Sequence, residues 1–275
     1  MGDEELYTLV PHLHILDYFF RTSNNHIYYR IAGHTIMLII FIRNTIAVNM
    51  AMNEHLPTHP ELQVFHDLGP RYATVWNIII QMTYAFLALA CDLSEVLNKD
   101  SLVPLELRKF RYTLFTGLLY PLGVGIAFVF WPHYIYDREL VFPKKVDIIM
   151  PFFENFAAHG LVSIYALYEL AFIPRDSIKN EKTYHYGVWF NVIYMVVLHY
   201  TRYIDLGIWA YEVFNVLEGS VYFYLLMVYP AICSTFFYTT LWWTQEAIWK
   251  LRDLQSSDSS SVSGSFMERL LAKKC

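Results

Sequence analysis

Charged side chains are scarce in this sequence. Asp, Glu, Lys and Arg together make up 16% of the 275 residues, against about 25% in a typical soluble domain. Hydrophobic residues make up 56%, and the mean hydropathy is +0.31. A chain with so little charge cannot present a water-soluble surface over its whole area. The composition therefore excludes an ordinary soluble domain and indicates a lipid bilayer as part of the solvent.

Cysteines and basic clusters are also few. Of the three cysteines, Cys91 and Cys233 fall within apolar segments and Cys275 is the last residue. This pattern excludes a disulfide framework and a zinc site built from cysteines. The formal net charge is -5, and no run of Lys and Arg is longer than two residues. We therefore exclude nucleic acid as a partner.

Short motifs that identify soluble enzymes are missing. The sequence contains no Gly-x-Ser-x-Gly, HExxH, Walker A or dinucleotide fingerprint, which excludes a soluble α/β hydrolase and leaves no cofactor to expect. His55 and His59 have the spacing of a metal pair, but Pro57 and Pro60 interrupt the helix that would align them, so we predict no metal site. Residues 1–5 are acidic where a signal peptide is basic, and no cleaved leader is expected.

Long apolar stretches dominate what is present. Segments long enough to cross about 30 Å of hydrocarbon cover 31–52, 70–97, 108–131, 146–173, 186–206 and 219–248. The aromatic pairs Phe130-Trp131 and Trp242-Trp243 lie at segment ends, where we expect them to anchor at the lipid headgroups. The sequence predicts an all-α integral membrane protein, a bundle of six transmembrane helices with a short N-terminal interfacial segment.

The two ends of the chain differ from this membrane domain. Residues 6–20 are too short and too polar to cross a bilayer and predict an interfacial amphipathic helix. The tail contains the serine-rich run 256–261 and is expected to be disordered. The predicted divisions are a cytosolic or interfacial segment 1–30, a membrane domain 31–249 and a disordered cytosolic tail 250–275.

Basic residues indicate the orientation. With both termini in the cytosol, fourteen Lys and Arg residues fall on the cytosolic side, namely Arg21, Arg30, Lys99, Arg108, Lys109, Arg111, Arg175, Lys179, Lys182, Lys250, Arg252, Arg269, Lys273 and Lys274. Five fall on the opposite side, namely Arg71, Arg138, Lys144, Lys145 and Arg202, and Arg43 lies within a span. Because cytosolic loops are enriched in Lys and Arg, this bias predicts cytosolic termini.

Polar residues recur on one face of two predicted spans. The second span carries Thr74, Asn77, Gln81, Ala85, Ala88, Asp92 and Glu95 at intervals of three and four, and the fourth carries Asn155, His159, Val162, Ala166 and Glu169. A charged side chain at mid-bilayer costs at least about 2.5–3.5 kcal/mol, so we expect both stripes to face the bundle interior and to pack together. Asn77, Gln81 and Ala85 favour plain helix–helix contact. A single His159 in an apolar helix is more often a hydrogen-bonded core residue than a catalyst, and spacing alone leaves both interpretations open.

Several short runs, in a fixed order over residues 31–249, carry a resemblance to a known family. They are Gly69-Pro70-Arg71-Tyr72-Ala73-Thr74-Val75-Trp76-Asn77 with Gln81, Asp92-Leu93-Ser94, Tyr136-Asp137-Arg138-Glu139, Phe142-Pro143-Lys144 with Asp147, Pro151, Asn155-Phe156-Ala157-Ala158-His159, and Gly207-Ile208-Trp209-Ala210-Tyr211. Together they resemble the family of the androgen-induced gene product and the androgen-dependent TFPI-regulating protein.

The resemblance implies a multi-pass membrane threonine hydrolase that cleaves fatty acid esters of hydroxy fatty acids. The family's catalytic pair matches Thr74 as nucleophile and His159 as general base and acid. Arg71, three residues before Thr74, is a candidate partner for the substrate carboxylate or a plain interfacial anchor. Asn155, one turn before His159, is a candidate for orienting its ring or for binding substrate.

The surroundings of this pair depart from the family pattern. Phe156 and Gly160 stand where the family usually has His and Thr, and Pro70 and Ala73 stand where it has an aromatic residue and Leu.

Two other classes remain open. Polar stripes also fit a transporter, although the sequence shows no internal repeat, and a non-catalytic membrane scaffold needs no site at all. For the hydrolase, the expected partners are a lipid substrate and the bilayer, with no protein partner indicated. The expected location is the endomembrane system, such as the endoplasmic reticulum, or the plasma membrane.

Overall fold

The computed structural model describes residues 26–99, 102–173 and 183–272, with side chains no further than Lys250. Within these ranges the chain is helical and forms no strand. The α-helices are α3 (Ile27–His55), α4 (Gln63–Leu68), α5 (Ala73–Val96), α6 (Leu105–Leu114), α7 (Tyr120–Asp137), α8 (Phe152–Phe156), α9 (Val162–Phe172), α10 (Tyr184–Tyr200), α11 (Glu212–Leu217) and α12 (Val221–Ala272).

Tighter and wider turns join or extend these helices. The π-helical turns are Phe115–Leu119, Ala157–Leu161 and Thr201–Asp205. The 3₁₀ turns are Pro60–Leu62, Gly69–Arg71, Arg138–Leu140 and Lys144–Ile148. Because α8, the second π-helical turn and α9 follow one another directly, residues 152–172 form one continuous helical stretch.

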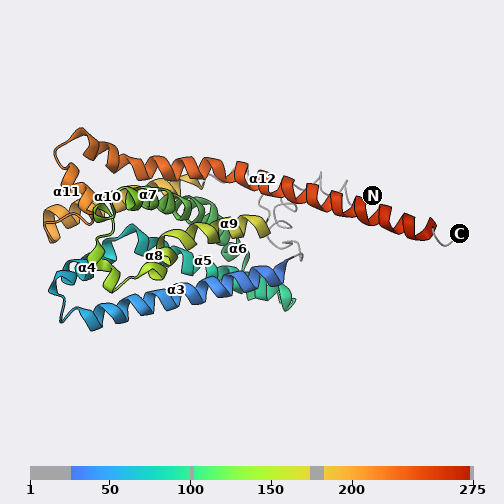
Figure 1. Cartoon of the computed structure of the whole chain (residues 1–275), viewed down its shortest axis with the longest axis horizontal. Coiled ribbons are helices and arrows are strands. Elements are labelled where there is room, and N and C mark those ends of the chain that lie inside the picture. The colour runs from blue at the N-terminus through green and yellow to red at the C-terminus, as the bar shows by residue number, and fades with distance from the viewer. Residues whose placement is uncertain (1–25, 100–101, 174–182, 273–275) are drawn as a thin grey trace.

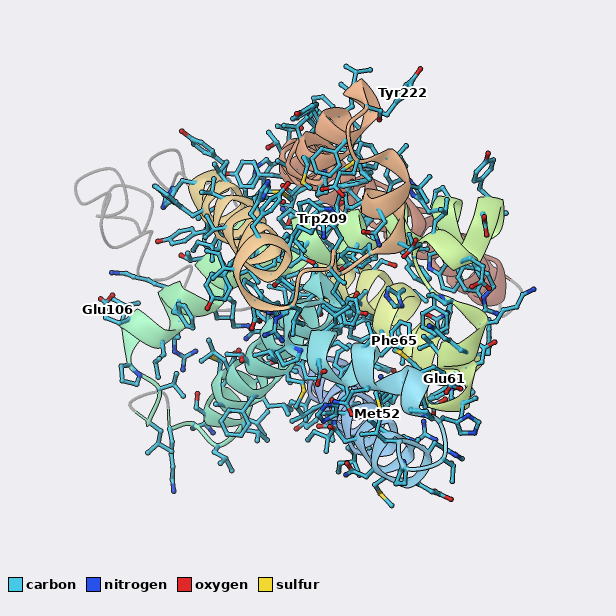
Figure 2. All side chains as sticks on the ribbon, turned by 90° about the vertical axis from the view of Figure 1, so that its left-hand side faces the viewer. Met52, Glu61, Phe65, Glu106, Trp209 and Tyr222 are labelled. Atoms are coloured by element: carbon cyan, nitrogen blue, oxygen red, sulfur yellow. The ribbon has the colours of Figure 1, made fainter. Side chains whose placement is uncertain are left out.

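The helices form an elongated bundle. In Figure 1, α3 and α12 run along opposite long sides, and α5, α7 and α9 lie between them. The central helices meet in a core of fully buried side chains that includes Tyr84, Phe115, Tyr165 and Leu170. Figure 2 looks onto the end of the bundle that carries α4 and α11, with Phe65 and Trp209 both labelled there.

The outward faces of the helices suit lipid. Ile36, Ile39 and Ile46 of α3 are 55%, 60% and 53% exposed, which is an apolar surface that water does not favour. Stretches in the described part of the chain that are long and apolar enough to span a membrane are Ile27–His55, Ala73–Val96, Leu105–Leu140 and Val221–Ile248, four in all.

The predicted count of six spans is therefore not confirmed. The segments predicted at 146–173 and 186–206 do form helical stretches, 152–172 and 184–205, but neither is among the four. In the first of them, Glu154, Asn155 and His159 lower the apolar content, which is the physical reason for the difference.

The structure describes most of the C-terminal segment of the chain but little of the N-terminal one. The expected interfacial helix 6–20 and the first part of the predicted segment 1–30 lie outside the described residues. The backbone of α12 continues as helix to Ala272 and projects beyond the bundle (Figure 1), whereas disorder was expected from residue 250. A helix that extends from an ordered span needs no new nucleation, because the turns before it are already formed.

The start of α5 decides where Thr74 lies. Pro70 sits in the 3₁₀ turn Gly69–Arg71, and Tyr72 then takes an extended conformation, with φ -78° and ψ 130°, as the N-cap. The helix begins at Ala73, so Thr74 is its second residue. At the other end, Asn98 adopts a left-handed conformation with φ 53°, which stops the helix.

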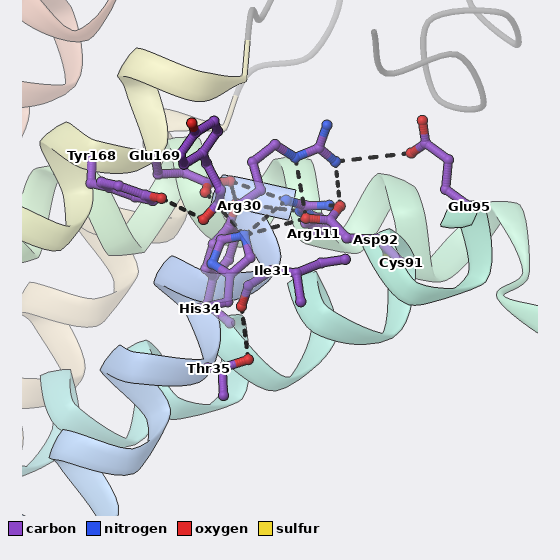
Figure 3. Close-up of polar contacts among 12 residues, drawn as sticks. Arg30, Ile31, His34, Thr35, Cys91, Asp92, Glu95, Arg111, Tyr168 and Glu169 are labelled. Carbon is purple, nitrogen blue, oxygen red and sulfur yellow. Dashed lines mark hydrogen bonds and ion pairs between the residues drawn. The ribbon is translucent and has the colours of Figure 1, made fainter. Parts of the chain in front are cut away.

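A buried ionic network holds the opposite end of the helices together (Figure 3). Arg30 of α3 forms an ion pair with Asp92 of α5. Arg111 of α6 donates to Asp92 Oδ1 at 2.8 Å and to Glu169 Oε1 of α9 at 3.2 Å. His34 Nε2 lies 3.4 Å from Glu169 Oε2. The network therefore links α3, α5, α6 and α9 through side chains that are almost fully buried.

This network also qualifies the orientation argument. Three of the fourteen Lys and Arg residues assigned to the cytosolic side, Arg30, Arg108 and Arg111, were expected at the membrane surface. All three are buried within the bundle, and Arg30 and Arg111 pair with Asp92.

Candidate active site

The two predicted polar stripes lie against each other, as expected. Thr74 Oγ1 is 3.0 Å from His159 Nε2, and further along, the Tyr84 hydroxyl donates to the Glu169 carboxylate. These contacts lie ten positions apart on both helices, so the two stretches run parallel and in register. This packing brings Thr74 and His159 together over 85 residues of sequence.

The hydrogen bonds of His159 define its tautomer. Its Nδ1 lies 3.1 Å from the backbone carbonyl oxygen of Asn155, and because a carbonyl can only accept, Nδ1 carries the proton. In the neutral ring, Nε2 is then an acceptor, and Thr74 Oγ1 can donate to it. A threonine hydroxyl whose proton points at an imidazole lone pair is an activated nucleophile.

The π-helical turn Ala157–Leu161 positions the imidazole. Such turns change the hydrogen-bond register within a helix and occur often at functional sites. Here the carbonyl of His159 accepts a hydrogen bond from Trp131 Nε1 of α7 at 3.2 Å. This hydrogen bond fixes the backbone of His159 to a neighbouring helix.

α7 also holds the ring itself. Phe130 stacks on the His159 imidazole with centroids 3.6 Å apart and planes 11° apart. The prediction that Phe130-Trp131 anchors at the headgroups is therefore wrong for Phe130, which is buried against His159. The position of Phe130 at the end of an apolar segment predicted an interface, but the orientation of α7 places its ring inside the bundle.

Two tyrosine hydroxyls cap the start of α5. The Ala73 N–H lies 3.1 Å from the Tyr194 hydroxyl and 3.2 Å from the Tyr211 hydroxyl. The Tyr194 hydroxyl is also 3.1 Å from the Arg71 carbonyl oxygen. No sequence argument singled out these tyrosines as site residues, although Tyr211 ends one of the runs that carry the family resemblance.

A cavity of about 820 Å³ opens beside the pair. Thr74 and His159 both line it, together with apolar side chains such as Phe130, Met52 and Phe65. Among the described residues, no Asp, Glu, Lys or Arg side chain lines the cavity. Its walls are therefore suited to uncharged acyl chains.

The other predicted site residues lie beside the cavity rather than on its wall. Arg71 donates to the Asp67 carbonyl and pairs with the Asp205 carboxylate. Asn155 supplies its backbone carbonyl to His159, while its side-chain Oδ1 is buried with no partner among the described residues. Neither residue is among those that line the cavity, and their roles in substrate binding stay predictions.

Buried amides continue the polar stripe below Thr74. Asn77 and Gln81 are fully buried, and their side-chain nitrogen and oxygen atoms have no hydrogen-bond partner among the described residues. The Gln81 amide lies against Gly123 of α7, where an added Cβ would be 2.9 Å from Gln81 Nε2. Gly123 thus leaves room for the Gln81 amide and permits the close approach of α7 to α9, where the added Cβ would be 3.1 Å from the Val162 carbonyl oxygen.

Phe156 and Gly160, the two departures from the family pattern next to His159, lie against each other. A Cβ atom on Gly160 would lie 2.6 Å from the Phe156 ring. Phe156 therefore occupies the space of a larger residue at position 160, and its ring stacks on Phe152 with centroids 6.1 Å apart. The Phe156 ring in this position therefore requires a glycine at position 160.

The connection between α7 and α8 closes one side of the cavity. The Arg138 guanidinium donates to Asp147, and Arg138 Nε donates to the Phe142 carbonyl at 3.1 Å. Phe142, which lines the cavity, lies edge-on to the His159 ring at a centroid distance of 6.5 Å.

Comparison with known proteins finds relatives over most of the chain. The model of the family described as FAR-17a/AIG1-like protein matches residues 26–245. The chain is 29% identical to the androgen-dependent TFPI-regulating protein of Mus musculus over 181 residues, which cover 63% of this chain and 77% of the relative. Its counterpart in Mesocricetus auratus is 31% identical over 173 residues, covering 60% and 72%. The androgen-induced gene 1 protein of Homo sapiens is 26% identical over 147 residues, covering 51% and 61%.

These names state no reaction for the relatives. No solved structure matches the chain.

Proposed function

We propose, given that this chain belongs to the FAR-17a/AIG1-like protein family, that it is a membrane-embedded lipid ester hydrolase with Thr74 as nucleophile and His159 as general base. The observation that carries the proposal is the 3.0 Å contact between Thr74 Oγ1 and His159 Nε2 at the wall of an apolar cavity. A threonine alone is a weak nucleophile, and a neutral imidazole within hydrogen-bond distance is the base it requires.

The reaction follows from these two groups. Thr74 Oγ1 attacks the ester carbonyl carbon while its proton passes to His159 Nε2. The tetrahedral intermediate collapses, the ester C–O bond breaks, and the leaving alkoxide takes the proton from His159. Water then attacks the acyl-threonine with His159 again as base, which releases the fatty acid and restores Thr74.

The substrate we propose is a fatty acid ester of a hydroxy fatty acid, as the family resemblance implies. Its ester lies partway along a chain, so two apolar chains must be accommodated on either side of Thr74. The uncharged cavity of about 820 Å³ supports this. Arg71 remains the proposed partner of the free carboxylate, which would then compete with Asp205 for the guanidinium.

The finer membrane arrangement also belongs to this proposal. We propose six spans with both termini in the cytosol, in the endomembrane system or the plasma membrane. The two helical stretches 152–172 and 184–205, which are as long as spans, support the count of six.

Single substitutions test the catalytic pair. Thr74→Ala and His159→Ala should each abolish hydrolysis of the branched ester by the purified full chain in lipid nanodiscs, and Thr74→Ala should abolish covalent labelling by a fluorophosphonate. Thr74→Ser, which keeps a hydroxyl, should retain measurable activity.

Matched controls exist on the same scaffold. Thr83 is exposed on α5 and only bonds to its own helix at Ile79 O. His199 is exposed on α10 and makes the same bond to the carbonyl four residues before it that His159 makes. Thr83→Ala and His199→Ala should leave turnover unchanged. Normal turnover by Thr74→Ala would end the assignment of the nucleophile.

A further inference from the structure

We infer that the Tyr211 hydroxyl donates the hydrogen bond that stabilises the oxyanion formed when Thr74 attacks an ester. This inference rests on the proposed function and adds the group that it lacks. An acyl transfer builds negative charge on the carbonyl oxygen, and fixed donors aimed at that oxygen are commonly the largest contribution to catalysis. Neither the Thr74 hydroxyl nor the His159 imidazole can serve, because both are used in the proton transfer.

Tyr211 is placed next to the nucleophile by the backbone of α5. Its hydroxyl lies 3.2 Å from the N–H of Ala73, the residue before Thr74. Tyr211, Thr74 and His159 all line the same cavity. A substrate carbonyl that approaches Thr74 from the cavity therefore meets this hydroxyl at the start of the helix.

The hydroxyl protons can be assigned by the available acceptors. Tyr194 has one proton and two acceptors in reach, the Arg71 carbonyl at 3.1 Å and the Tyr211 hydroxyl oxygen at 3.1 Å. Tyr211 accepts from Ala73 N–H, and among the described residues the only acceptor in reach of its own proton is the Tyr194 oxygen. When Tyr194 donates to the Arg71 carbonyl, the Tyr211 proton can turn toward a substrate oxygen without leaving a backbone group unpaired.

Thr74 itself contributes a second donor. The first hydrogen bonds of α5 run from Val75 N at 3.0 Å and Trp76 N at 3.4 Å to the Tyr72 carbonyl. The N–H of Thr74 precedes them and belongs to the first turn, whose amides have no partner within the helix. The charge of the oxyanion also suits the positive end of the helix.

The Tyr211 ring is held by its surroundings. It contacts the Tyr72 ring edge-on at a centroid distance of 5.5 Å and the Phe214 ring at 6.0 Å. Tyr211 is also the N-cap of α11 in an extended conformation, with φ -124° and ψ 136°. These contacts fix the hydroxyl before substrate binds, which is the condition for a donor to lower the barrier.

The two oxyanion donors keep their protons throughout the attack of Thr74 on the ester. As Thr74 Oγ1 bonds to the ester carbon, the carbonyl π electrons move to oxygen, the threonine proton moves to His159 Nε2, and Tyr211 and the Thr74 amide donate hydrogen bonds without losing their protons. Collapse restores the carbonyl and expels the alkoxide, which leaves with the proton from His159.

The test is Tyr211→Phe in the full-length protein in nanodiscs, with Tyr194→Phe as the matched control. Tyr194 shares the cap of Ala73, but its proton has a backbone acceptor. We expect Tyr211→Phe to lower kcat by about 10²-fold or more, as loss of one such donor does, with KM unchanged. It should raise the inhibition constant of a long-chain trifluoromethyl ketone, which forms a tetrahedral adduct, by the same factor.

Tyr194→Phe, which removes the other hydroxyl from the cap of Ala73, should lower thermal stability and should lower kcat by a much smaller factor than Tyr211→Phe does. Equal losses of kcat in the two variants would show that the tyrosines only shape the turn and would overturn the inference, as would full activity of Tyr211→Phe. These outcomes differ from a failure of the proposed function, in which Thr74→Ala keeps its activity and its fluorophosphonate labelling.

Discussion

Phe156 and Gly160 show how single residues determine the surroundings of His159. The Phe156 ring fills the space that any side chain at position 160 would need. Since both residues belong to the helical stretch that carries His159, a change at one alters the helix that positions the imidazole. The sequence shows that both residues depart from the family pattern, but only their contact in the structure shows that the two departures are linked.

Gly160→Thr alone should destabilise the protein by about 1–3 kcal/mol, because an overpacked core forces the Phe156 ring from its place. Phe156→His combined with Gly160→Thr should recover most of that loss, since the smaller ring releases the space. Equilibrium unfolding of the purified protein in detergent, measured for both single variants and the double variant, gives the coupling free energy. Purely additive effects would contradict the contact.

Between elements, the buried ionic network decides how α6 joins the bundle. Arg111 donates to carboxylates on two other helices, Asp92 of α5 and Glu169 of α9. All three side chains are at most 10% exposed. Removing one member of such a network leaves the opposite charge buried with less compensation, which costs more than the pair itself contributes.

Arg111→Ala should therefore lower the stability of the folded protein by about 3–5 kcal/mol. The control is Lys109→Ala in the same helix, because Lys109 is 42% exposed and pairs with the exposed Glu106 at 3.2 Å. Such surface pairs contribute about 0–1 kcal/mol. Unfolding in detergent monitored by tryptophan fluorescence compares the two, and equal midpoints would show that the network does not support α6.

For the whole molecule, the proposed orientation in the membrane rests on the distribution of cations. Even without the buried Arg30, Arg108 and Arg111, the proposed cytosolic side keeps more Lys and Arg residues than the other side. The parallel run of α5 and the stretch 152–172 agrees with this arrangement, because the second and fourth spans of a six-span chain cross in the same direction.

An epitope tag at either terminus should react with antibody as soon as the cytosolic face of the membrane is accessible. A tag in the 132–145 connection should react only after the opposite face is opened. Selective permeabilisation of cells expressing each tagged chain provides the measurement. Termini that respond under different conditions would mean an odd number of spans.

Features that depend on residues close together in the sequence could be predicted, whereas contacts between residues far apart in the sequence could not. Periodicity within one helix is local, so the stripe positions of Asn77, Gln81 and Asp92 predicted burial, and all are fully buried. The same stripes placed Thr74 and His159 on facing helices. The identity of the partner side chains depends on how each helix is rotated against several others, and no local pattern encodes that rotation.

The sequence by itself determined that the chain is helical, that its surface faces lipid, and that polar residues on two helices meet inside the bundle, since hydropathy and spacing act over a few residues. Only the tertiary structure decided that Phe130 stacks on His159, that Arg30 pairs with Asp92, and that two tyrosine hydroxyls reach the start of α5. The physical reason is that these contacts join segments far apart in the chain, and their geometry exists only after the helices have packed.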